Sequence, residues 1–229
     1  MINFKQITNN YIDLSCSDKF LNHYNKNNSF SNYIIDKEIN ADMYNEEIFN
    51  SLFINNPTVI DAGANVGLFT LYVLPKSKKI FCIEPTPSHF EVLKDLVGNF
   101  DKENKVSFHN IALSNKDGEC YFEEIERNTT ENKITNRKTN LKLTCSSLFS
   151  FFKENNIESI DILKLDIEGG ENEIIFNDPL IENVFKKCKN IYIECHPPVD
   201  ENAMINKICA IGFIHKNGNR SNSHYFLLK

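Results

Sequence analysis

The chain has 229 residues, 41% of them hydrophobic, and a formal net charge of −6. This length suits one α/β domain that buries roughly 70–75% of its extended surface. The net negative charge argues against an enzyme that binds long nucleic acid, because contacts between basic side chains and phosphates dominate the affinity for such a partner. The sequence has no apolar run long enough for a membrane span and no apolar leader, and its seven cysteines include no C-x-x-C pair. We therefore expect a cytoplasmic protein with reduced thiols.

Two segments precede the first strand. Residues 1–40 are polar, carry scattered aromatic side chains such as Phe20, Tyr24, Phe30 and Tyr33, and show no clean period, so we expect an N-terminal cap or extension. Residues 41–53 place apolar side chains on one side of a predicted helix, which Pro57 and the two asparagines before it end. The main domain is therefore expected to span residues 41–229.

The most informative stretch is a strand, a glycine turn and a helix at residues 58–73. Thr58, Val59 and Ile60 read as a buried parallel strand. The turn at residues 61–67, which we call the glycine turn, reads D-A-G-A-N-V-G. Its glycines predict a backbone that brings main-chain N–H groups close to a ligand. Gly63 is expected to allow the tight turn, and Gly67 to let the helix approach the strand.

The spacing of the glycine turn discriminates between ligands. A dinucleotide fingerprint requires glycine where Asn65 stands. The carboxylate of Asp61 would repel a pyrophosphate and attract a cationic ligand. S-adenosylmethionine carries an ammonium and a sulfonium and no phosphate, so it is favoured over NAD. The alternative is that Asp61 only caps the turn.

The second and third strands follow. Glu84 ends the strand at residues 79–85, in a position suited to a ribose diol. Thr86 and Pro87 begin a helix as N-cap and first residue. Residues 106–113 predict the third strand, and Asp117-Gly118 turns the chain into an added β-hairpin. The polar loop at residues 123–142 is either functional or disordered.

Charged residues mark the ends of the fourth and fifth strands. In the fourth strand, residues 160–168, alternation places Lys164, Asp166 and Glu168 on one face. Either they serve a site, or Lys164 and Asp166 form an ion pair that caps the helix beginning at Glu171. In the fifth strand, residues 190–196, Glu194 and His196 share a face, and His196 is either catalytic or structural.

The alternation of strands and helices predicts a doubly wound, mostly parallel, seven-stranded Rossmann-like sheet of the α/β class. Further helices are predicted at residues 148–156 and 200–210. The tail pairs residues 213–215 with residues 224–228 as a hairpin. Ligands of such a sheet bind at the carboxyl ends of the strands.

Several segments resemble the FkbM family of methyltransferases. In order they read IDAGANVGLFT, IEPTPSHFEVL, HNIALSNKDGECYF, LFSFFKENNIESIDILKLDIEGGENEII and IYIECHPP. The resemblance covers about residues 58–198 and leaves out residues 1–40 and the loop at 123–142. The K-x-D-x-E-G-x-E pattern from Lys164 to Glu171 is its most diagnostic part.

The resemblance implies a class I fold and an S-adenosylmethionine-dependent O-methyltransferase. Its acceptor would be a hydroxyl of a sugar, glycan or glycan precursor, or of a secondary metabolite. The positions that correspond to cofactor-binding residues are Asp61, Gly63, Ala64, Asn65 and Gly67 for the methionine part, Glu84 and Pro85 for the ribose, and Asn110 and Ala112 beside the adenine. Asp166 would lie near the transferred methyl group.

Methyl transfer to a hydroxyl requires positioning and the removal of a proton. Asp166 and His196 are the candidate bases, and Lys164 is the candidate for holding the acceptor oxygen. A divalent Mg²⁺ or Mn²⁺ at Asp166, Glu194 and His196 is the less favoured alternative. Two other classes stay open at this point: an NAD(P)-dependent oxidoreductase and a non-catalytic ligand-binding subunit. The sequence leaves the oligomeric state undetermined.

Overall fold

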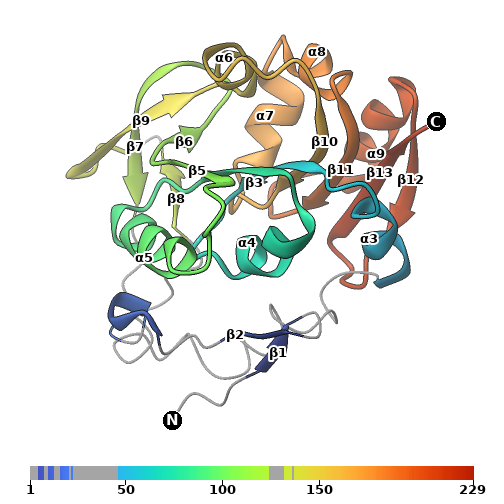
Figure 1. Cartoon of the computed structure of the whole chain (residues 1–229). Coiled ribbons are helices and arrows are strands. Elements are labelled where there is room, and N and C mark those ends of the chain that lie inside the picture. Colours follow the sequence, from blue (N-terminus) through green and yellow to red (C-terminus); the bar gives the residue numbers. More distant parts are fainter. Residues whose placement is uncertain are drawn as a thin grey trace.

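The computed structural model describes residues 5–7, 10–12, 16–20, 22, 46–123, 132–135 and 137–229. Much of the predicted cap, including Tyr24, Phe30 and Tyr33, lies outside these residues, as do residues 41–45 of the first predicted helix. Within the cap, β1 (Lys5–Ile7) and β2 (Asn10–Ile12) pair as antiparallel strands (Figure 1). Phe20 is 1% exposed and joins the core of the main domain.

The main sheet has seven strands in the order β12-β13-β11-β10-β3-β4-β5. Five are parallel: β3 (Thr58–Ala62), β4 (Lys79–Ile83), β5 (Val106–His109), β10 (Ile160–Leu165) and β11 (Cys188–Glu194). The strands β12 (Phe213–Asn217) and β13 (Ser223–Leu228) form an antiparallel hairpin on β11. The predicted mostly parallel sheet of seven strands is confirmed.

Helices cover both faces of this sheet (Figure 1). On one face, α3 (Glu46–Leu52), α4 (Leu68–Val73) and α5 (Pro87–Gly98) pack on a core that includes Val59. On the other, α6 (Leu148–Glu154), α7 (Glu171–Asn177), α8 (Ile181–Phe185) and α9 (Glu201–Ala210) pack on a core that includes Ile60. Both faces of the central strands are buried, which explains their continuous apolar runs.

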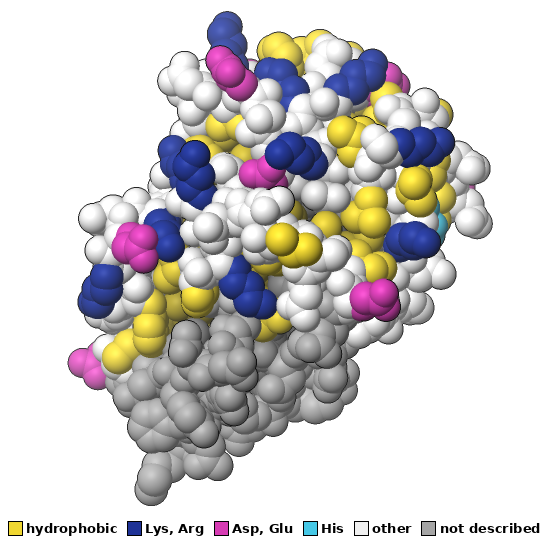
Figure 2. Space-filling view, turned by 45° about the vertical axis from the view of Figure 1, so that its right-hand side comes forward, with side chains coloured by type: hydrophobic (Ala, Val, Ile, Leu, Met, Phe, Trp, Pro, Cys, Tyr) yellow, Lys and Arg dark blue, Asp and Glu magenta, His cyan; other side chains and the backbone are white. Residues whose placement is uncertain are grey.

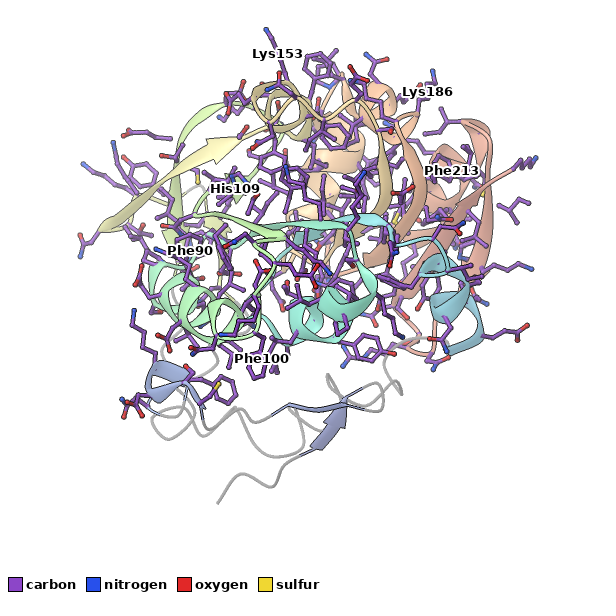
Figure 3. All side chains as sticks on the ribbon, in the orientation of Figure 1. Phe90, Phe100, His109, Lys153, Lys186 and Phe213 are labelled. Atoms are coloured by element: carbon purple, nitrogen blue, oxygen red, sulfur yellow. The ribbon has the colours of Figure 1, made fainter. Side chains whose placement is uncertain are left out.

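The region after β5 differs from the expectation of one strand and one added hairpin. The predicted strand at residues 106–113 is divided into β5 and β6 (Ala112–Leu113), because Ala112 pairs with Cys145 of a second sheet. That sheet has the order β6-β9-β7-β8, with β7 (Gly118–Glu123), β8 (Lys133–Thr135) and β9 (Leu141–Ser146). Figure 3 labels His109 at the end of β5, where its ring packs 4.9 Å from that of Phe151.

The surface shows no single dominant feature on the face in Figure 2. There, Lys and Arg side chains lie scattered among uncharged and hydrophobic ones and do not form a continuous stripe. None of the seven cysteines forms a disulfide. No helix within the described ranges combines the length and the apolar character needed to cross a bilayer.

Candidate active site

The carboxyl ends of the parallel strands open on a cavity of about 1000 Å³. Its wall also includes β7 and β8 of the second sheet, so the described parts of the loop at residues 123–142 belong to the cavity. Six of the predicted cofactor-binding residues line it, namely Gly63, Ala64, Asn65, Glu84, Pro85 and Ala112. The other three, Asp61, Gly67 and Asn110, lie behind the lining, and Asn110 donates from Nδ2 to the carbonyl oxygens of Glu84 and Pro85.

The two glycines of the turn have different steric roles. Gly63 has φ +78°, and a Cβ atom there would overlap the carbonyl oxygen of Asp166. Gly67 has φ +94°, and its Cβ atom would lie 2.6 Å from Val97 and 2.7 Å from Leu93. Gly63 therefore brings the turn against the end of β10. Gly67 brings it against α5 rather than against the strand, which corrects the sequence expectation.

The N–H groups of the glycine turn are used within the protein. Those of Gly63 and Ala64 donate to the carbonyl oxygen of Ile83 at 2.9 and 3.0 Å, and that of Asn65 donates to Glu84 Oε2 at 2.8 Å. The expectation that the turn presents these groups to a ligand is therefore wrong for all three. A phosphate would find none of them available, in keeping with a ligand that carries no phosphate.

Glu84 lies 4% exposed at the end of β4, where its two oxygens are held separately. Oε2 accepts from Asn65 N–H and Oε1 from Thr86 N–H, both at 2.8 Å. Burial raises the pKa of the Glu84 carboxyl to about 7, although the hydrogen bonds from Thr86 and Asn65 oppose this rise. A carboxylate offers about four acceptor sites, and the backbone and side chain of Thr86 and the N–H of Asn65 use three of them, which leaves capacity for about one further donor.

The carboxylate of Asp61 is paired within the protein and is not exposed to a ligand in the cavity. It is fully buried, accepts from Thr70 Oγ1 at 2.7 Å, and lies 3.1 Å from Lys164 Nζ. The ammonium of Lys164 also lies 3.2 Å from the carbonyl oxygen of Gly63 and 3.4 Å from Asp166 Oδ2. Burial lowers the pKa of Lys164, but the charges of Asp61 and Asp166 outweigh it, so the pKa is raised.

Three oxygens thus lie within 3.4 Å of the Lys164 ammonium. Lys164 therefore links the glycine turn to the end of β10. The predicted ion pair of Lys164 with Asp166 is present, but it is accompanied by the deeper pair with Asp61.

Beyond Lys164 lies the acidic cluster, which consists of Asp166, Glu168, Glu171, Glu194 and His196. Strand β10 ends at Leu165, and Glu168 reaches the cluster through a turn with φ +54°, not through strand alternation. His196 Nε2 lies 3.6 Å from Glu168 Oε2 and 4.0 Å from Asp166 Oδ1, and its Nδ1 lies 3.3 Å from Glu171 Oε1. The structure therefore brings the three predicted acidic residues and His196 together.

The electrostatics of the acidic cluster bear on proton transfer. Burial lowers the pKa of His196, but the hydrogen bond with Glu171 and the charges of Glu168 and Asp166 outweigh it and raise the pKa to about 9. Burial, only partly offset by His196, raises the pKa of Glu168 to about 8. At neutral pH the raised pKa keeps His196 protonated, so its ring has no lone pair with which to take a further proton.

Several residues of the site were not predicted as site residues, among them Arg220 and Glu171. Arg220, in the turn between β12 and β13, donates from Nη1 to Glu194 Oε1 at 2.7 Å and lines the cavity. Glu171 is fully buried and accepts from the N–H groups of Ile167 and Gly169 at 2.7 and 2.9 Å. The K-x-D-x-E-G-x-E pattern contained a signal for Glu171, whereas no local pattern distinguishes Arg220.

The fold and the site together define a class of protein. The strand order, the glycine turn after β3 and the buried acidic residue after β4 are those of a class I, Rossmann-like methyltransferase. Residues 61–221 match the model of the Methyltransferase FkbM domain. The chain belongs to the FkbM family and is an S-adenosylmethionine-dependent methyltransferase, which removes the oxidoreductase and the non-catalytic subunit as alternatives.

Individual proteins show the same relationship. Methyltransferase sdnD of Sordaria araneosa is 27% identical over 63% of this chain and 68% of its own length. Methyltransferase 1 of Beauveria bassiana is 23% identical over 54% of this chain and 59% of its own. The crystal structure of methyltransferase FkbM from Methylobacillus flagellatus KT superposes with a TM-score of 0.54 and 14% identity, covering 75% of this chain but only 44% of that one.

Proposed function

We propose that this methyltransferase transfers the methyl group of S-adenosylmethionine to a hydroxyl oxygen of a sugar, glycan or glycan precursor. The observation that carries the proposal is that one cavity is lined both by Glu84 and by the carboxylates of Asp166 and Glu194. Carboxylates accept hydrogen bonds and protons, so they suit an acceptor that presents O–H donors. A polyhydroxylated acceptor offers several such donors to this wall.

At the cofactor side, the acceptor capacity that remains on Glu84 suits a hydroxyl of a ribose diol. Asn65 supports the same placement, because its Oδ1 is buried, has no hydrogen-bond partner among the described residues, and belongs to a residue that lines the cavity. An ammonium group of the methionine part would satisfy this oxygen. A buried acceptor without a partner costs about 1–3 kcal/mol, so such a partner would be favoured.

At the acceptor side, Asp166 is the proposed base. In the reaction the acceptor oxygen forms a bond to the methyl carbon while the bond between that carbon and sulfur breaks. The electron pair of the broken bond stays on sulfur. The hydroxyl proton passes to the carboxylate of Asp166. Positioning both substrates supplies much of the rate, and the base adds roughly 10²–10⁴-fold. The cavity, at the upper end of the usual range for ligand sites, has room for both substrates.

The first test concerns the cofactor. A ligand at about 100 times its dissociation constant stabilises the folded protein by roughly 2.7 kcal/mol. S-adenosylmethionine or S-adenosylhomocysteine should therefore raise the melting temperature by several degrees, whereas NAD should not. A shift with NAD and none with either adenosyl ligand would refute the proposed use of the cavity.

The second test concerns the acceptor. A panel of sugars and sugar derivatives would be incubated with S-adenosylmethionine that carries a labelled methyl group, and the products analysed by mass spectrometry. A product with the label on oxygen supports the proposal. Label found only on nitrogen, carbon or sulfur, across this panel and a matched panel of amines and thiols, would refute O-methylation.

A further inference from the structure

We propose that Asp166, Glu194 and His196 form a binding site for one divalent metal ion. One potential ligand atom from each residue lies within 4.8 Å of the others. Metal–ligand bonds of about 2.1 Å would place neighbouring ligands about 3.0 Å apart and opposite ligands about 4.2 Å apart. The three side chains therefore need to move by about 1 Å or less to share one ion.

The carboxylate of Glu194 is an independent sign that the site takes a ligand. The residue is 6% exposed, and its Oε1 is held by Arg220 at 2.7 Å. Its Oε2 is buried and has no hydrogen-bond partner within the described parts of the chain. A buried carboxylate oxygen without a partner is costly, and a cation would satisfy it.

The orientation of His196 is that of a metal ligand. Nδ1 lies 3.3 Å from Glu171 Oε1, and Glu171 is itself fixed by two backbone N–H groups. Metal-binding histidines commonly donate their second ring N–H to a carboxylate in this manner. Nε2 faces Glu168 and Asp166 at 3.6 and 4.0 Å. These distances are too long for charge-assisted hydrogen bonds, which are about 2.7–2.9 Å, and they leave space for an ion.

The arrangement of charged side chains points the same way. Lys164 lies beside Asp61 and Asp166, and Arg220 lies beside Glu194, whereas Glu168 and Glu171 lie beside His196. A divalent ion would add positive charge where these carboxylates gather. Two carboxylates and one imidazole suit Mn²⁺ or Mg²⁺.

Such an ion would refine the proposed function, on which this consequence rests: with Asp166 as a ligand, the ion rather than a free carboxylate would make the acceptor hydroxyl more acidic. Three protein ligands leave up to three positions of a six-coordinate ion open, and Asp166 and Glu194 both line the cavity. Two neighbouring oxygens of the acceptor, as in a 1,2-diol, could fill two of them. The metal site would then select acceptors with vicinal oxygens.

The test measures binding of Mn²⁺ by electron paramagnetic resonance, in which bound ions lose the six-line signal of free Mn²⁺. The wild-type chain should bind one equivalent. Asp166→Asn, Glu194→Gln and His196→Ala should each weaken binding by at least about tenfold, and so should Glu171→Gln through the orientation of His196. Glu182→Gln, which removes an exposed carboxylate on α8, is the matched control and should bind as the wild type does.

Absence of Mn²⁺ binding by the wild-type chain at millimolar concentration, with and without S-adenosylhomocysteine, would overturn the proposal. Equal binding by the wild type and the folded site variants would also overturn it, because the ion would then lie elsewhere. Asp166→Asn and His196→Ala keep the comparison decisive if Glu194→Gln does not fold. Calorimetry with S-adenosylhomocysteine on the same samples distinguishes failure of the metal proposal from failure of the proposed function. If the chain binds the adenosyl ligand but no Mn²⁺, only the metal proposal is refuted.

Discussion

The glycine turn with Glu84 and the acidic cluster occupy the same edge of the sheet, yet they differ in which groups are paired. In the turn, three N–H groups are paired within the protein and Asp61 lies beside Lys164 and Thr70, while Asn65 Oδ1 has no partner among the described residues. In the acidic cluster, carboxylates gather around one histidine, and Glu194 Oε2 has no partner among the described residues. The backbone of the turn is therefore pre-formed, and the acceptors that stay open in the two regions are buried side-chain oxygens.

The largest expected effect comes from breaking the connection between the two regions. Lys164→Met would leave Asp61 as a buried, unpaired charge, so we expect a loss of about 3–5 kcal/mol in the free energy of unfolding. Lys189→Met is the matched control, because Lys189 forms an exposed ion pair with Asp161 and its loss should cost at most about 1 kcal/mol. Urea denaturation would measure both, and similar losses would contradict the central role of Lys164.

The second effect isolates the acidic cluster. Asp166→Asn keeps the shape of the side chain and removes its charge. We expect single-turnover methyl transfer to fall by about 100-fold or more, while the affinity for S-adenosylhomocysteine changes little, because the lost interaction acts mainly in the transition state. Transfer at the wild-type rate would remove Asp166 from the chemical step.

The third effect isolates the cofactor side. Glu84→Ala should lower the affinity for S-adenosylhomocysteine by about ten- to a hundredfold, since hydrogen bonds to a charged carboxylate contribute roughly 1.5–3 kcal/mol. Glu91→Ala, on the exposed side of α5, should leave the affinity unchanged. Calorimetry on both folded variants would measure this, and an unchanged affinity in Glu84→Ala would contradict the proposed contact of Glu84 with the ribose.

The smallest effect is a pH dependence that belongs to Glu84. Its pKa of about 7 leaves it about half protonated in the ligand-free protein at pH 7. A ribose diol donates to the ionised form, so binding should release up to about half a proton at pH 7, and affinity should rise by up to about tenfold from pH 6 to pH 8. Calorimetry in buffers of different ionisation enthalpy would detect this release, and Glu84→Gln should abolish it. Proton uptake would contradict the assignment.

The sequence by itself determined the seven-stranded sheet and the edge at which the cavity opens, and most of the residues predicted for the site line this cavity. Continuous apolar runs identify buried parallel strands, and alternation with helices brings the carboxyl ends of those strands to one edge. Asn65, Glu84, Asp166 and Glu194 all follow from their positions at these ends. The glycine turn was recognised from local spacing alone, because its tight backbone depends on residues close in sequence.

Only the tertiary structure decided which of these residues pair with one another. Lys164 lies about a hundred residues after Asp61 along the chain and neutralises it across adjacent strands. Arg220 reaches Glu194 from a hairpin turn, and the third predicted strand divides because Ala112 finds its partner in Cys145. Such contacts depend on register and on the course of distant segments. Local pattern carries no information about these, so the charge state of the site emerged only when the chain was folded.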